Sequence, residues 1–240
     1  MTQLNTLLNG GSALVAVIFA FFSVILTLIW YKRTKNKTFI TGIFMTLAIG
    51  FGWMGITISF LSILLTGANL PYYYLFIRFF SYSTLPVGSV AIMAVGWDMF
   101  MPSKKYKKTM LLIMILISVF YYIVLYWDIY AVTEVSNTGG SELIDDWLIP
   151  MTIPYFIFLG MTGLTSGMLG IAFFNFFKKT SGDIRKRAIL VVFGAIFLGS
   201  AVLMDTVIFV GVMWKDLLFI PRIQVTVGGI CILFGFKPAY

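Results

Sequence analysis

The chain has 240 residues, of which 60% are hydrophobic and only 11% are charged. A soluble domain normally carries about 25% charged residues, so the composition excludes an ordinary soluble protein. The chain contains no histidine and a single cysteine, Cys231. It therefore lacks the commonest metal ligand and the commonest general base, and it cannot form an intramolecular disulfide.

Long apolar runs follow one another along the chain, and each is long enough to cross about 30 Å of hydrocarbon as a helix. The sequence therefore predicts an all-α integral membrane protein: a seven-transmembrane helix bundle forming a single domain over residues 1–240, with no soluble domain. The expected spans are about 12–31, 38–66, 72–101, 109–127, 148–177, 188–213 and 217–236.

Basic residues fall in alternate loops. Residues 31–37, 102–108 and 178–187 carry four, four and five Lys or Arg, and with Lys237 they account for 14 of the 17 in the chain. The positive-inside rule then places the N-terminus outside and the C-terminus in the cytoplasm, with the chain expected in the cell (plasma) membrane. The basic loops are expected to meet anionic lipid headgroups rather than nucleic acid.

The longest external loop, about 128–147, is acidic and contains the turn-like sequence SNTGGS at Ser136–Ser141. A loop of this length either forms a short hairpin or lid, or it is a mobile connector. The sequence leaves these two alternatives open.

Glycines recur along one stripe of the fifth span, at a spacing that lets helices approach closely. Packing against a neighbouring helix of the same chain is expected here, ahead of dimerisation. Glycines of the sixth and seventh spans are expected to have the same role. The two sets are Gly160, Gly163, Gly167 and Gly170, and Gly194, Gly199, Gly228 and Gly229.

Three charged residues interrupt the outer halves of the apolar spans: Arg78, Asp205 and Arg222. Each lies roughly 8–12 Å below the outer surface, at 1.5 Å per helical residue. A charge facing lipid there would cost several kcal/mol, so the three are expected to face inward together. We expect an ion pair between Asp205 and Arg222, with Arg78 close by.

Polar residues at helical spacing extend this cluster, since Tyr82 follows Arg78 by one turn and Thr226 follows Arg222 by one turn. Two bases and one acid predict a surplus positive charge, and hence an outward-facing cavity for an anionic or carbonyl-bearing small ligand. The alternative is a buried ion pair that only orders the bundle. The candidate ligand-binding residues are Arg78, Tyr82, Asp205, Arg222, Gln224 and Thr226.

Trp53 lies in the middle of a span, where core packing is expected ahead of lining a pocket. No catalytic constellation is apparent. Without histidine there is no nucleophile–base pair of the usual kind, and no phosphate-binding loop occurs. The chain is therefore expected not to be an enzyme and to require no cofactor or metal.

Three segments resemble the seven-transmembrane sensor region of prokaryotic histidine kinases, and this likeness of pattern covers most of the chain. They are FIRFFSYSTLPVGSVAIMAVG followed by PSKKYKK, then KKTSGDIRKRAILVVFGAIFLGS, and finally IPRIQVTVGGICILFGF. The resemblance implies a receptor or sensor. Because no kinase or other output domain is expected, signalling would pass through a separate cytoplasmic or membrane partner at the basic loops 102–108 and 178–187.

A weaker similarity is to microbial rhodopsins, because Arg78 is followed by Pro86 and the tract TVGGICILFG follows Arg222. The position matching their retinal lysine is Thr226, so the resemblance implies a rhodopsin-like protein without covalent retinal. Two further alternatives are a small-solute transporter with repeated three-helix units and a structural subunit of a membrane complex.

Overall fold

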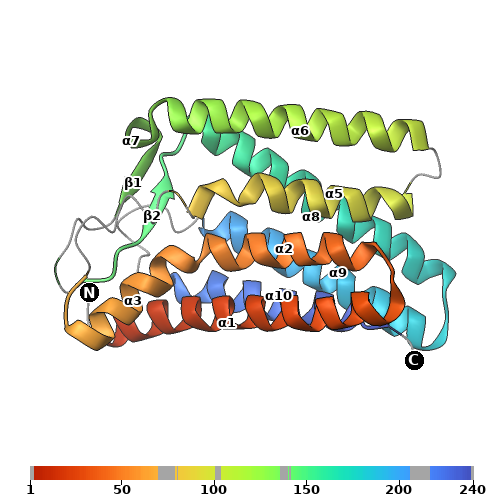
Figure 1. Ribbon diagram of the computed structural model, residues 1–240, viewed down its shortest axis with the longest axis horizontal. Coiled ribbons are helices and arrows are strands. Elements are labelled where there is room, and N and C mark those ends of the chain that lie inside the picture. The colour runs from red at the N-terminus through yellow and green to blue at the C-terminus, as the bar shows by residue number, and fades with distance from the viewer. Residues whose placement is uncertain are drawn as a thin grey trace.

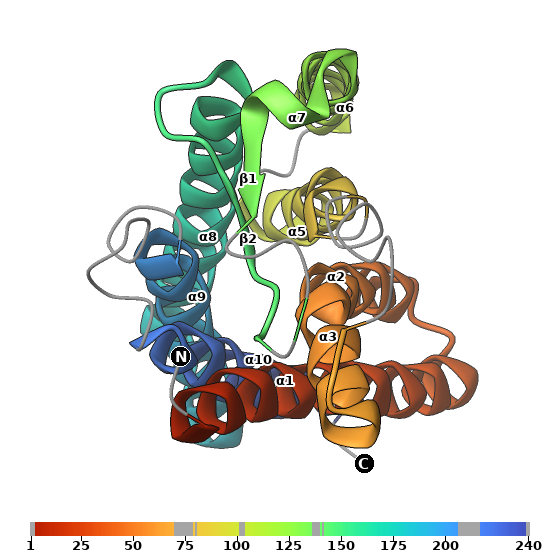
Figure 2. The ribbon, with the colours of Figure 1, turned by 90° about the vertical axis from the view of Figure 1, so that its left-hand side faces the viewer.

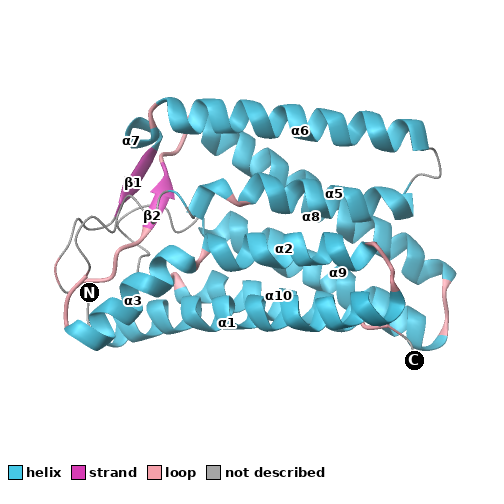
Figure 3. Cartoon of the chain, in the orientation of Figure 1, coloured by secondary structure: helices cyan, strands magenta, loops and turns pink. Residues whose placement is uncertain are grey.

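The computed structural model describes residues 3–69, 79, 81–100, 104–135, 140, 142–205 and 217–238. Long helices lie side by side along one direction, and two short strands lie at one end of the bundle (Figures 1 and 3). Arg78, one of the candidate ligand-binding residues, lies outside the described residues.

The helices are α1 (Gln3–Thr34), α2 (Thr38–Gly52), α3 (Met54–Thr66), α5 (Leu85–Phe100), α6 (Lys104–Trp127), α7 (Ile129–Val132), α8 (Ile153–Lys179), α9 (Gly182–Leu203) and α10 (Phe219–Phe236). Five of them, α1, α6, α8, α9 and α10, are long and apolar enough to cross a membrane. Helices α2 and α3 bend by 45° at Trp53 and make a sixth crossing if they form one span. The expected helical, multi-pass membrane protein is thus confirmed at this level.

Helices α9 and α10 pack closely through glycine. A Cβ on Gly194 would lie 2.5 Å from Cγ1 of Ile232 and 2.7 Å from the carbonyl oxygen of Gly228, so no side chain fits there. A Cβ on Gly229 would lie 2.6 Å from the Phe19 ring of α1. The close approach expected for these glycines is confirmed.

The glycine stripe of α8 behaves differently. A Cβ on Gly160, Gly163 or Gly167 would meet no described atom within 4 Å, and all three glycines are exposed. The expectation that this stripe packs against a neighbouring helix is therefore wrong for these three positions. Helix α8 instead buries the opposite face, which carries Met161 and Leu169.

The loop 128–147 contains a hairpin, which decides between the two alternatives left by the sequence. Strands β1 (Thr133–Val135) and β2 (Asp146–Leu148) pair antiparallel, with Thr133 opposite Leu148. Just before β2, the chain runs across the end of the bundle (Figure 2), and Leu143, Ile144 and Asp145 are buried there.

Ser59 of α3 holds this buried segment in place. Its hydroxyl is fully buried, accepts a hydrogen bond from the Ile144 N–H at 3.0 Å and donates one to Oδ1 of Asn69 at 2.7 Å. Asn69 in turn donates from its backbone N–H to the Gly140 carbonyl at 2.9 Å and from its side chain to the Glu142 carbonyl. Ser59 and Asn69 together therefore position the loop that carries Asp145.

Replacing Ser59 with Ala is expected to lower the free energy of unfolding by about 1–3 kcal/mol, because the buried Ile144 N–H loses its acceptor. Faster amide hydrogen exchange over residues 142–145 would accompany the loss. Ser118→Ala is the matched control, since that buried hydroxyl donates only to the Met114 carbonyl of its own helix. Equal effects of the two variants would contradict the anchoring role of Ser59.

Candidate functional site

Arg222 lies in the first turn of α10 and is fully buried. Its Nη2 donates to the Asp145 carboxylate in an ion pair, and its Nη1 donates to the backbone carbonyl of Asn9 in α1 at 2.9 Å. The guanidinium also lies 5.4 Å from the centroid of the Trp53 ring, at the break between α2 and α3. One side chain thus ties α10 to α1, to the α2–α3 bend and to the segment before β2.

The expected ion pair between Asp205 and Arg222 is wrong. Among the described residues, the partner of Arg222 is Asp145. Asp205 lies just beyond the end of α9, close enough for Arg222 and Asp145 to act on it electrostatically. The physical reason is the position of the loop: Ser59 bonds the Ile144 N–H, and the adjacent Asp145 carboxylate then lies against the guanidinium.

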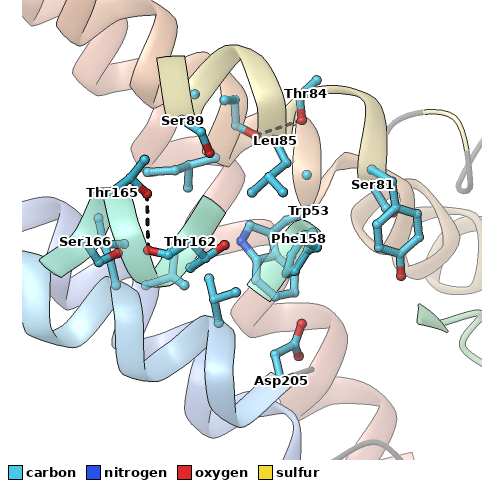
Figure 4. Close-up of a pocket in the computed structure, with 18 of the residues that line it drawn as sticks. Trp53, Ser81, Thr84, Leu85, Ser89, Phe158, Thr162, Thr165, Ser166 and Asp205 are labelled. Atoms are coloured by element: carbon cyan, nitrogen blue, oxygen red, sulfur yellow. Dashed lines mark hydrogen bonds between the residues drawn. The ribbon is translucent and has the colours of Figure 1, made fainter. Parts of the chain in front are cut away.

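A cavity of about 180 Å³ lies beside this ion pair, between α2, α5, α8, α9 and the segment before β2 (Figure 4). The Asp205 side chain points into it below Trp53 and Phe158. Trp53 therefore lines the pocket as well as packing against core side chains. The hydroxyl lining is Ser81, Thr84, Ser89, Thr162, Thr165 and Ser166. The aromatic lining is Trp53, Tyr82, Trp147 and Phe158.

Two polar groups at the wall lack partners among the described residues. Asp205 makes no hydrogen bond or ion pair with another described residue. The buried Thr162 hydroxyl also has no hydrogen-bond partner among the described residues, whereas that of neighbouring Thr165 donates to the Met161 carbonyl at 2.7 Å. Buried polar groups in folded proteins are nearly always satisfied, so the Thr162 hydroxyl is available to a bound molecule. The half-buried Asp205 carboxylate points into the cavity and is available as well.

The remaining candidate residues are divided between this cavity and other places. Tyr82 lines the cavity, and its ring meets that of Phe158 edge to face, with centroids 6.3 Å apart. Thr226 instead lines a second, smaller cavity of about 50 Å³ between α1, α2, α5 and α10, and its hydroxyl donates to the Arg222 carbonyl. Gln224 is half-buried and lines neither cavity.

The charge balance at the cavity differs from the sequence-based expectation. The described residues supply two carboxylates, Asp145 and Asp205, against one guanidinium, Arg222. Within this described set, Arg222 is compensated by Asp145, and Asp205 is the carboxylate that has no opposite charge paired with it. The expected positive surplus counted Arg78, which lies outside the described residues, and omitted Asp145.

Comparison with protein-family models finds no match, and a search of curated proteins also finds none. Function is therefore inferred from the chemistry of the site rather than from the fold, since one helical architecture serves many functions.

Proposed function

We propose that this chain is a receptor or sensor of a prokaryotic cytoplasmic membrane that binds a small ligand from outside. The observation that carries the proposal is the 180 Å³ cavity, whose wall holds a carboxylate and a hydroxyl with no partner in the described chain. Such convergent polar groups in a largely apolar pocket are the usual mark of a ligand site. In this proposal the protein has no catalytic activity of its own.

The proposed topology has seven spans, with the N-terminus outside and the C-terminus inside. Its support is the distribution of charge along the bundle. The β1–β2 hairpin lies at the end where α1 begins, and α1 and α8 both end at the opposite end (Figure 1). Lys32 and Arg33 lie in the last turn of α1, and Lys178 and Lys179 lie in the last turn of α8. Because basic residues are retained on the cytoplasmic side, and because the segment before β2 lines the cavity, this distribution supports a cavity in the outer half.

The proposed route of signalling runs from the cavity to the basic loops. The cavity is shared by α2, α5, α8 and α9, so an occupant that binds one arrangement of these helices better than another shifts the population toward it. Helices α8 and α9 meet at residues 180–181, within the basic stretch 178–187, most of which is helical. A separate partner would read the shift there and at the basic stretch 102–108, whose residues 104–108 begin α6. Anionic lipid headgroups are the other partners of these loops.

Filling the cavity tests whether it is a binding site. Ser89 of α5 is buried and lines the wall, so Ser89→Phe, with the smaller Ser89→Leu beside it, is expected to occupy the space. Three probes of one size and different charge are suitable: benzylammonium, benzyl alcohol and benzoate. At least one is expected to raise the Tm of the wild-type chain in lipid nanodiscs by ligand linkage, and both variants are expected to lose this shift.

Circular dichroism and size-exclusion chromatography show whether the Ser89 variants remain folded. If no probe raises the wild-type Tm above the shifts in the variants, the cavity is not a ligand site. Transport is tested separately, by loading proteoliposomes and measuring uptake of the probe that binds. Sustained uptake would replace the receptor proposal with the small-solute transporter, and a stoichiometric partner in mild detergent would favour a complex subunit.

A further inference from the structure

We propose that the ligand of this cavity is a small organic cation, held by the Asp205 carboxylate beneath the aromatic faces of Trp53 and Phe158. This inference rests on the proposed function, because it assigns a ligand class to the same cavity. It reverses the anionic ligand expected from the sequence.

The first support is the state of Asp205. Its side chain points into the cavity (Figure 4), and it forms no ion pair or hydrogen bond with another described residue. A carboxylate away from bulk water is costly unless a cation or hydrogen-bond donors compensate it. A ligand ammonium group supplies both charge and donors at that position.

The second support is that both terminal nitrogens of Arg222 are already engaged, so that only its Nε lacks a partner among the described residues. Arg222 is fully buried, one of its terminal nitrogens donates to Asp145 and the other to the Asn9 carbonyl. Arg222 is also absent from the cavity wall. Among the described residues, an anionic ligand would meet the Asp205 carboxylate in the cavity wall or compete with Asp145 for Arg222, and both are unfavourable.

The third support is the aromatic content of the wall. Trp53, Tyr82, Trp147 and Phe158 line the cavity together with Asp205. Aromatic faces attract ammonium groups, most strongly where water is excluded, and this is how quaternary ammonium ligands are recognised. Trp53 already lies 5.4 Å from one cation, the guanidinium of Arg222.

The size of the cavity limits the ligand. A volume of about 180 Å³ is slightly larger than the roughly 150 Å³ of an engineered cavity that binds benzene. One aromatic ring with a short aminomethyl arm, or a tetraalkylammonium group, is therefore the appropriate scale. The Thr162 hydroxyl, which lacks a partner among the described residues, gives such a ligand a second polar contact.

The test compares benzylammonium, benzyl alcohol and benzoate by isothermal titration against the full chain in lipid nanodiscs. The wild type is expected to bind benzylammonium roughly 10–100-fold more tightly than benzyl alcohol, which is the usual gain from a charged hydrogen bond. Benzoate is expected to bind more weakly than the alcohol. Asp205→Asn is expected to abolish the preference for the cation while benzyl alcohol binding is retained.

Asp183→Asn is the matched control, because this carboxylate lies at the start of α9 and is exposed beside Lys186. It is expected to keep the wild-type preference. Equal affinities for the three probes, or tightest binding of benzoate, would overturn the cation assignment while leaving a ligand-binding cavity in place. Retention of the preference in Asp205→Asn would overturn it as well.

If Asp205→Asn does not fold, the order of the three probes on the wild type decides the assignment alone. If no probe binds the wild type at all, the cation assignment and the proposed binding function both fail. The two failures are therefore distinguishable.

Discussion

Replacing Asp145 with Asn is expected to lower the free energy of unfolding by about 3–5 kcal/mol, because the buried Arg222 guanidinium loses its counter-ion. The loss should appear as a lower midpoint in thermal and SDS unfolding of the purified chain. Asp183→Asn removes a carboxylate from an exposed pair and is expected to change stability by less than about 1 kcal/mol. The contrast separates a buried ion pair from a surface ion pair of the same chemistry.

Asp205→Asn gives the second comparison. The Asp205 carboxylate forms no ion pair with Arg222, so Asp205→Asn is expected to lower the free energy of unfolding by less than Asp145→Asn does. Replacing both Asp145 and Arg222 with apolar residues of similar size should recover much of the loss, because neither desolvated charge remains. A larger cost for Asp205→Asn than for Asp145→Asn would contradict the structure and support the pairing expected from the sequence.

Gly194→Leu is expected to destabilise the bundle by about 3 kcal/mol, because the new side chain collides with α10. Its Cβ alone would lie 2.7 Å from the Gly228 carbonyl oxygen and 3.1 Å from the backbone nitrogen of Ile232. Backbone atoms cannot move aside as a flexible side chain can, so α9 and α10 must separate. The measurement is again the unfolding midpoint, with the amount of folded chain recovered from membranes as a second readout.

Gly163→Leu is the matched control on α8, where a Cβ meets no described atom within 4 Å. It is expected to change stability by no more than about 0.5 kcal/mol, as for substitutions away from packed features. If Gly163→Leu were as damaging as Gly194→Leu, the exposed placement of the α8 stripe would be wrong.

The helices were predictable because their signal is local. Runs of apolar residues long enough to cross hydrocarbon identify α1, α6, α8, α9 and α10 without reference to any other part of the chain. Glycine spacing was less informative. Spacing shows which residues share a helix face, but it does not show whether that face meets a neighbour, and Gly163 and Gly194 differ in this respect.

The partner of Arg222 was not predictable in the same way. Asp145 is 77 residues distant in sequence and lies in a loop whose path depends on the Ser59 hydroxyl and on the β1–β2 pairing. The signal that could have identified this partner was the acidic composition of the loop 128–147, which was expected on the same side of the membrane as Arg222. Asp205 was the nearer acid in sequence, and helical depth alone favoured it.

The cavity itself depends on tertiary packing. The α2–α3 bend at Trp53 and the packing of α8, whose Thr162 lines the cavity, bring together residues that are far apart in the chain. The distance of Asp205 from the end of its expected span, and the one-turn spacing of Tyr82 from Arg78, identified these two as candidates, and both line the cavity. The sequence could not show that Thr226 turns toward a different cavity.

The most direct test of the cation site is an experimental structure of the full chain crystallised in lipid with 4-bromobenzylammonium. The bromine gives an anomalous signal that locates the ligand independently of the protein map. We predict one strong peak inside the cavity, with the ammonium group between Asp205 and the rings of Trp53 and Phe158, and no such peak in Asp205→Asn. An empty cavity with bromine only on the lipid-facing surface, or an unchanged peak in Asp205→Asn, would contradict the account.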